Sequence, residues 1–100
     1  MKLYTLVRRD LPKSQQAVQS CHAVAELLLR VGAQGWDNGT MVLIGVPGEP
    51  ALKQWHEKLT GLSHKCGVFR EPDIGDQITA ISFVGVPAGL EREVSTLPLL

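Results

Sequence analysis

The stretch "MVLIGV", residues 41–46, is a continuous apolar run that ends at the breaker "PGEP". Such runs are typical of a strand that is buried on both faces of its sheet. A second run, "KLYTLVRR" at residues 2–9, predicts another buried strand over Leu3–Val7. The pattern between the two runs predicts a helix, and a helix joining two strands implies a parallel pair with a right-handed crossover.

Two helices are expected. The first should run from about Gln15 to Val31, with Ser14 as its N-cap and Gly32 just beyond its end. The segment "PALKQWHEKLTGL", residues 50–62, predicts the second, with a proline near its first turn. One face of this second helix carries four large apolar residues, Leu52, Trp55, Leu59 and Leu62. Trp55 is expected in the core because it lies in this apolar stripe.

The remainder of the chain predicts a shorter strand over Lys65–Phe69, an acidic turn "DIGD", a last strand "QITAISFVGV" and a short helical turn. The resulting order is β-α-β-α-β-β. It indicates the α/β class, with a four-stranded mixed β-sheet flanked by helices on both faces. At 100 residues, the chain forms one layered α/β/α domain over residues 1–100.

Composition limits the kind of protein this can be. Apolar residues make up 44% and charged residues 20%, which is ordinary for a soluble globular domain. No apolar run reaches the length of a membrane span, so we expect no membrane partner. The N-terminus has no small-residue cleavage site, and two cysteines do not form a disulfide framework. We therefore expect a cytoplasmic protein.

Charge is unevenly distributed, although the net charge is zero. Residues 1–30 have a balance of +3, from Lys2, Arg8, Arg9, Lys13 and Arg30 against Asp10 and Glu26. Residues 71–100 have a balance of −4, from Glu71, Asp73, Asp76, Glu91 and Glu93 against Arg92. Two interpretations stay open, namely solvated charge on opposite faces or a basic rim beside an acidic catalytic patch.

The first helix separates its adjacent cysteine and histidine. On a helical wheel, Gln15, Gln19 and His22 fall on one polar stripe with Glu26 and Arg30. Cys21 falls on the opposite, apolar side, which we expect to face the core. His22 is either an exposed helix residue or part of a site. Neighbouring helical residues do not face each other, so the pair is not expected to share a metal or a proton.

Metal and nucleophile sites find little support. The chain has no paired short spacing of cysteine or histidine of the kind that structural zinc sites show. A cysteine hydrolase would need Cys21 to face a base, whereas Cys21 is expected to face inward. No glycine-rich phosphate-binding loop is present either.

Three segments in order resemble the archaeal and eukaryotic type of peptidyl-tRNA hydrolase. These are "VRRDL" followed by a basic loop, the helix with Gln19, His22 and Ala23, and the turn "DIGDQI" before the last strand. The ending "FVGVPA" is similar to the strand exit of that family. The resemblance covers nearly the whole chain. It implies the same mixed-sheet fold, in a protein that is often a dimer.

The resemblance implies hydrolysis of the ester that joins a peptide, or a blocked amino acid, to tRNA, without a metal or cofactor. It makes Asp73 the carboxylate that positions or activates water. His22 and Gln19 would orient the acceptor end of the substrate, and phosphates would meet three basic residues, Arg8, Arg9 and Lys13.

The chain also departs from the family pattern. Gln15 aligns with a functional lysine of the family. The acidic turn is one residue shorter and lacks the family's threonine, and Asp76 occupies that region. Thr79 is a candidate substitute hydroxyl. The alternative to an esterase is a non-catalytic or repurposed member of the fold that binds an RNA end, a nucleotide or a protein partner. A further alternative is an enzyme that acts on another aminoacyl ester.

Overall fold

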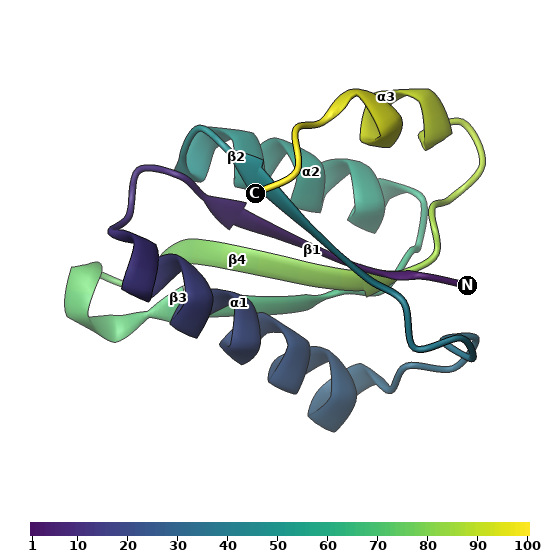
Figure 1. Ribbon diagram of the computed structural model, residues 1–100, viewed down its shortest axis with the longest axis horizontal. Coiled ribbons are helices and arrows are strands. Elements are labelled where there is room, and N and C mark those ends of the chain that lie inside the picture. Colours follow the sequence, from purple (N-terminus) through teal and green to yellow (C-terminus); the bar gives the residue numbers. More distant parts are fainter.

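The computed structural model describes residues 1–100, and its four strands form one mixed sheet in the order β2-β1-β4-β3 (Figure 1). Strand β1 (Leu3–Arg8) pairs parallel with β2 (Met41–Val46) and antiparallel with β4 (Gln77–Val84). Strand β3 (Gly67–Glu71) pairs antiparallel with the other edge of β4. The four-stranded mixed sheet predicted from the sequence is confirmed.

Helices cover both faces of this sheet (Figure 1). Helix α1 (Lys13–Glu26) lies on one face and continues as a π-helical turn, Leu27–Val31. Helices α2 (Glu49–Gly61) and α3 (Glu91–Thr96) lie on the other face. None of these helices is long and apolar enough to cross a bilayer. The α/β class with flanking helices is therefore confirmed.

The element boundaries differ from the sequence expectations by about a turn or less. Helix α1 begins at Lys13, and its cap is Pro12 rather than Ser14. Pro12 keeps an extended ψ of 150° while its carbonyl accepts the Gln16 N–H, so it occupies the capping position without a side-chain bond. Gly32 ends the π-helical turn at φ 89°, as expected for a glycine.

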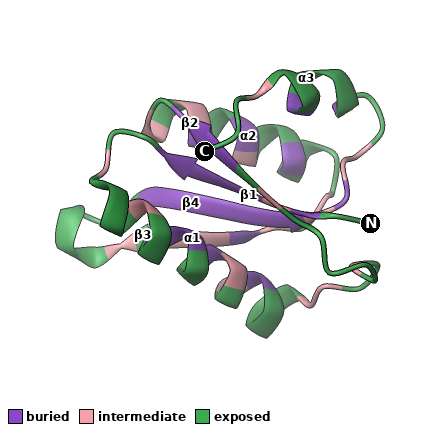
Figure 2. Cartoon of the chain, viewed as in Figure 1, coloured by how far each residue is buried: buried purple, intermediate pink, exposed green.

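The main core lies between the sheet and helices α2 and α3. Leu52, Trp55 and Leu59 of α2 are buried against the strands, as expected (Figure 2). The strands contribute alternate residues to the same core, among them Leu6, Ile44, Ile81 and Phe83. Leu62, predicted on the same apolar face, lies beyond the end of α2 and is 52% exposed.

The expectation that Cys21 faces the core is wrong, because Cys21 is exposed. The buried residues of α1 are instead Gln19, Ser20 and Ala23. The helix is rotated so that the boundary between its polar and apolar arcs faces the sheet. Cys21 and His22 still lie on different flanks, and His22 stacks on Phe69 of β3.

A glycine in β3 explains where α1 lies. A Cβ atom on Gly67 would come within 2.4 Å of the Leu27 backbone nitrogen and 2.6 Å of the Ala23 carbonyl oxygen. The end of α1 therefore packs directly on the β3 backbone, next to the small core of Val7, Ala23 and Ala80. This close approach draws α1 over β3 and β4.

The same placement leaves β2 uncovered on the face of the sheet where α1 lies. An open apolar groove of about 520 Å³ lies between the flank of α1 and strand β2. None of its lining residues is charged, and they include Ala17, Cys21, Val24, Leu28, Met41 and Leu43. We call this surface the α1–β2 face.

Replacing Gly67 by alanine should force α1 away from β3. We expect Gly67→Ala to lower the free energy of unfolding by about 1–3 kcal/mol, as overpacking typically does. The measurement is equilibrium unfolding in urea. Gly61→Ala is the matched control, because a Cβ at Gly61 meets nothing within 4 Å and should stabilise α2 by up to about 1 kcal/mol. Equal stability of the two variants would contradict the close approach.

Candidate active site

A small cavity of about 240 Å³ lies at the end of the sheet where β1 leads into α1 and β3 turns into β4. It brings together four residues that the sequence singles out, Gln15, Gln19, Asp73 and Thr79. Four further residues complete the lining, Leu11, Pro12, Glu71 and Ile74. The site thus combines the start of α1 with the β3–β4 turn, which are far apart in the sequence.

A β-bulge directs Thr79 into this site. In the β3–β4 ladder Phe69 pairs with Ala80 and Arg70 pairs with Ile78, so Thr79 has no partner residue. An unpaired residue lets two successive side chains point to the same face, and bulges often direct a side chain in this way. Ala80 packs beside Ala23 of α1, and Thr79 reaches Gln19 on the same helix.

Three side chains form a chain of hydrogen bonds from the sheet to the cavity. The Thr79 hydroxyl donates to Gln19 Oε1 at 2.7 Å, and Gln19 Nε2 donates to Gln15 Oε1 at 3.2 Å. Thr79 and Gln19 are 0% and 2% exposed, so their bond is shielded from water. Because Gln15 accepts the last of these hydrogen bonds through its side-chain oxygen, the amide N–H donors of this exposed residue are free for a ligand.

Two carboxylates line the same cavity. Asp73 lies in a 3₁₀ turn, Pro72–Ile74, and Glu71 is the last residue of β3. Neither side chain forms an ion pair or accepts a hydrogen bond within the chain. The sequence analysis missed Glu71. Its two-residue spacing from Asp73 was the available signal, because the turn folds both residues toward α1.

Two other sequence candidates lie outside the cavity. Asp76 follows the turn at φ 58°, is exposed, and its backbone N–H donates to the Glu71 carbonyl. His22 is exposed one turn further along α1, and its ring stacks on Phe69 with centroids 4.1 Å apart and planes 8° apart. The two rings are stacked face to face, so Phe69 supports one face of the exposed His22 ring.

The three basic candidates are in different environments. Arg8 is buried on the opposite face of the sheet, where it donates two bonds to Asp10 and one to Gln77. The bond to Asp10 raises the pKa of Arg8, and it lowers the pKa of Asp10. Arg9 is exposed and donates to the Leu99 carbonyl. Lys13 is exposed and forms no ion pair.

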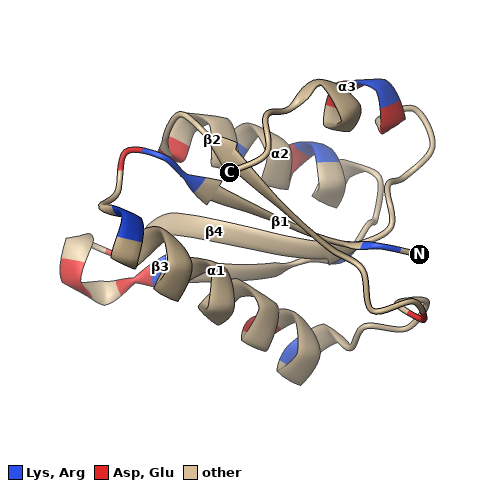
Figure 3. Cartoon of the chain, in the orientation of Figure 1, with Lys and Arg blue, Asp and Glu red and all other residues tan.

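Positive and negative charge meet at this end of the molecule (Figure 3). The basic residues at the end of β1 and the start of α1 lie beside the acidic β3–β4 turn, whereas Glu91 and Glu93 lie on α3. The first turn of α1 has no side-chain cap, and the backbone N–H groups of Lys13, Ser14 and Gln15 have no partner. A helix start of this kind favours negative charge.

The lining of the cavity carries side chains of the kinds that take part in acid–base chemistry. No three histidine, cysteine, aspartate or glutamate side chains are placed to hold a metal ion. The cavity offers two carboxylates as proton acceptors, the Gln15 amide as a neutral donor, and free backbone donors beside them. Such a set can orient a water molecule and stabilise a developing oxyanion.

Comparison with known proteins gives the fold. The chain is similar to the solved structure of Atu0240 from Agrobacterium tumefaciens strain C58, described as a protein of unknown function. The TM-score is 0.74 at 10% sequence identity, and the match covers 99% of this chain and 96% of the other. No family model and no curated protein matches the sequence.

The Thr79–Gln19 bond gives a prediction about stability. Thr79→Val keeps the shape of the side chain but leaves Gln19 Oε1 buried without a donor, so we expect a loss of about 1–3 kcal/mol. Thr79→Ser keeps the hydroxyl and loses one methyl group, which should cost about 1 kcal/mol. Urea unfolding of both variants measures the difference. A valine variant as stable as the serine variant would show that the bond contributes little.

Proposed function

We propose that this chain is a peptidyl-tRNA hydrolase-like esterase, which hydrolyses the ester between a peptide, or a blocked amino acid, and tRNA. The observation that carries the proposal is the single cavity that unites Asp73, Gln19, Thr79 and Gln15. The resemblance had selected these residues from separate parts of the chain. A coincidental resemblance would give no reason for them to share one site.

The proposed reaction needs one water molecule and no cofactor. Asp73, assisted by Glu71, accepts a proton as the water oxygen attacks the ester carbonyl carbon. The carbonyl oxygen becomes an oxyanion, which the Gln15 amide and the free N–H groups at the start of α1 stabilise. The intermediate then releases the ribose hydroxyl, which takes up the proton, and the free carboxylic acid.

The substrate would be held outside the cavity. Lys13 is an exposed, unpaired cation at the start of α1, beside the site. It supplies charge for the phosphates of the acceptor end, which require cations rather than sequence readout. The exposed His22 ring, supported from behind by Phe69, provides a platform for stacking a terminal base, since aromatic rings accept any base. Arg8 takes no direct part, because Asp10 and Gln77 occupy its guanidinium.

Turnover of an N-acetyl-aminoacyl-tRNA tests this proposal. We expect Asp73→Asn to lower kcat by about 10²–10⁴-fold, the usual contribution of general acid–base catalysis. Asp76→Asn should retain most of the rate, because Asp76 lies outside the cavity and asparagine tolerates its positive φ. His22→Ala should raise KM more than it lowers kcat. Release of the labelled amino acid measures each rate.

The same assay separates the esterase from the binding alternative. Glu57→Gln, an exposed carboxylate of α2 far from the cavity, serves as the control for general charge effects. If the wild type shows no turnover yet binds the tRNA with an affinity that falls steeply with salt, the chain is a binding protein. If the wild type neither turns over nor binds the tRNA, tRNA is not its substrate.

We also propose that two copies associate through the α1–β2 face. The groove is uncharged, so two copies meet without like-charge repulsion, and each would cover the other's exposed apolar residues. Leu28, Met41 and Leu43 are 47%, 54% and 38% exposed there. The small side chains of Ala17 and Cys21 would let the two α1 helices approach closely.

Sedimentation at micromolar concentration tests this association. The wild type should be a dimer, and Leu28→Glu should be a monomer because it places a charge at the centre of the buried surface. Leu62→Glu is the matched control, since Leu62 is similarly exposed but lies at the end of α2. A monomeric wild type, or equal effects of the two variants, would contradict the proposed interface.

A further inference from the structure

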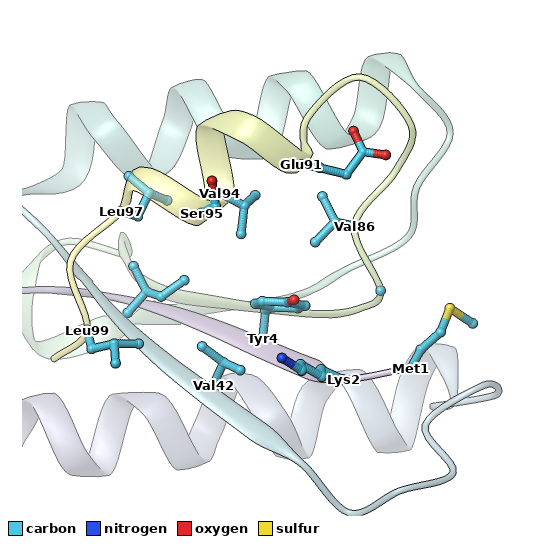
Figure 4. A pocket seen from close by; sticks show the side chains of 12 residues that line it. Met1, Lys2, Tyr4, Val42, Val86, Glu91, Val94, Ser95, Leu97 and Leu99 are labelled. Carbon is cyan, nitrogen blue, oxygen red and sulfur yellow. The ribbon is translucent and has the colours of Figure 1, made fainter.

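A second and larger cavity lies on the opposite face of the sheet, away from the candidate active site. It has a volume of about 680 Å³ and lies between α3 and strands β1 and β2 (Figure 4). Volumes of this size are typical of sites for small organic ligands. Nothing in the proposed esterase reaction uses this cavity, because its lining shares no residue with the catalytic one.

The walls of this cavity are mainly apolar. Tyr4 and Val42 form its floor on the sheet, and Val94 and Leu97 form the wall opposite (Figure 4). Ile44 of β2 also lines the cavity. The Tyr4 ring stacks on the buried Phe83 ring, with centroids 5.6 Å apart and planes 15° apart. The floor of this open cavity is therefore held in place by the core, as in the largely preformed sites that bind small ligands.

Polar groups gather at one end of the apolar walls. Lys2 and Tyr4 are two residues apart on the chain, so both side chains point to the same face of the sheet. Neither the Lys2 ammonium nor the Tyr4 hydroxyl has a hydrogen-bond or ion-pair partner in the chain. One cation and one hydroxyl are thus available to a ligand.

The other charges nearby already have partners. The Glu91 carboxylate, which also lines the cavity, accepts the backbone N–H of Gly89 at 2.8 Å. The amino terminus of Met1 is bonded to the Gly35 carbonyl and to Asp37. Glu91 has no ion-pair partner, but Lys2 is the one charged group at this cavity with neither a hydrogen bond nor an ion pair. An apolar wall beside such a cation favours an amphipathic anion.

We propose that this cavity binds a small amphipathic carboxylate. The apolar body of the ligand would lie between the Tyr4 ring and α3, and its carboxylate would meet the Lys2 ammonium and accept a hydrogen bond from the Tyr4 hydroxyl. A cationic ligand would meet Lys2 as a like charge, and its only counter-charge would be the partly occupied Glu91. A purely apolar ligand would leave both free polar groups unused.

Titration with octanoate tests the proposal, followed by the backbone amide signals of the ¹⁵N-labelled protein. We expect saturable shifts confined to the N-terminal end of β1, to β2 and to α3. Lys2→Gln should weaken octanoate binding by about fivefold, the upper effect of an exposed ion pair. Lys65→Gln is the matched control, because Lys65 is also exposed and unpaired but lines no part of this cavity.

Two further measurements make the test decisive. Neutral octanol should bind the wild type and Lys2→Gln equally, because it presents no charge to Lys2. Ser95→Phe places a ring in the cavity from the exposed side of α3 and should abolish octanoate binding, with circular dichroism confirming the fold. Shifts centred on the α1–β2 face, no effect of Lys2→Gln, or unchanged binding by Ser95→Phe would each overturn the proposal.

Discussion

The buried hydrogen bond from Thr79 to Gln19 links the bulge of β4 to helix α1, and the position of that helix determines the surface features on its side of the sheet. The bond fixes the first half of the helix, and the contact of Gly67 with the Ala23 and Leu27 backbone fixes its end. With both ends held over β3 and β4, α1 cannot also cover β2. The polar cavity on one side of the helix and the apolar α1–β2 face on the other are therefore consequences of one placement.

The elements of the fold were accessible from the sequence because their signals are local. Continuous apolar runs identify β1 and β2, and the second of these is predicted to the residue, Met41–Val46. The rotation of α1 was not accessible in the same way. Its apolar arc favoured Cys21 as a core residue, but helix position depends on what the sheet permits, and Gly67 and the bulge are tertiary features.

The site was partly predictable for a related reason. Gln15 and Gln19 are one helical turn apart, so their shared stripe follows from helix geometry alone. That Thr79 meets Gln19 depends on the unpaired residue in the β3–β4 ladder, which shifts the alternation of β4 and is not visible in its sequence. Arg8 shows the opposite case. Strict alternation with Leu6 along β1 already places it on the α2 face, away from the cavity.

The division of charge at this end of the molecule fits the proposed esterase reaction. The lining of the cavity combines the carboxylates of Glu71 and Asp73 with the neutral donor Gln15, where the resembling family has a lysine. A cation inside would form an ion pair with the carboxylates, whereas a neutral amide leaves them unpaired to orient water. Positive charge is kept outside, on Lys13, and Asp10 neutralises Arg8 on the far face of the sheet. A polyanionic substrate would therefore be held at the rim, and only its uncharged ester would enter the cavity. The carboxylates would repel phosphates that approach the cavity, which disfavours misplaced substrate without hindering the reaction of the ester.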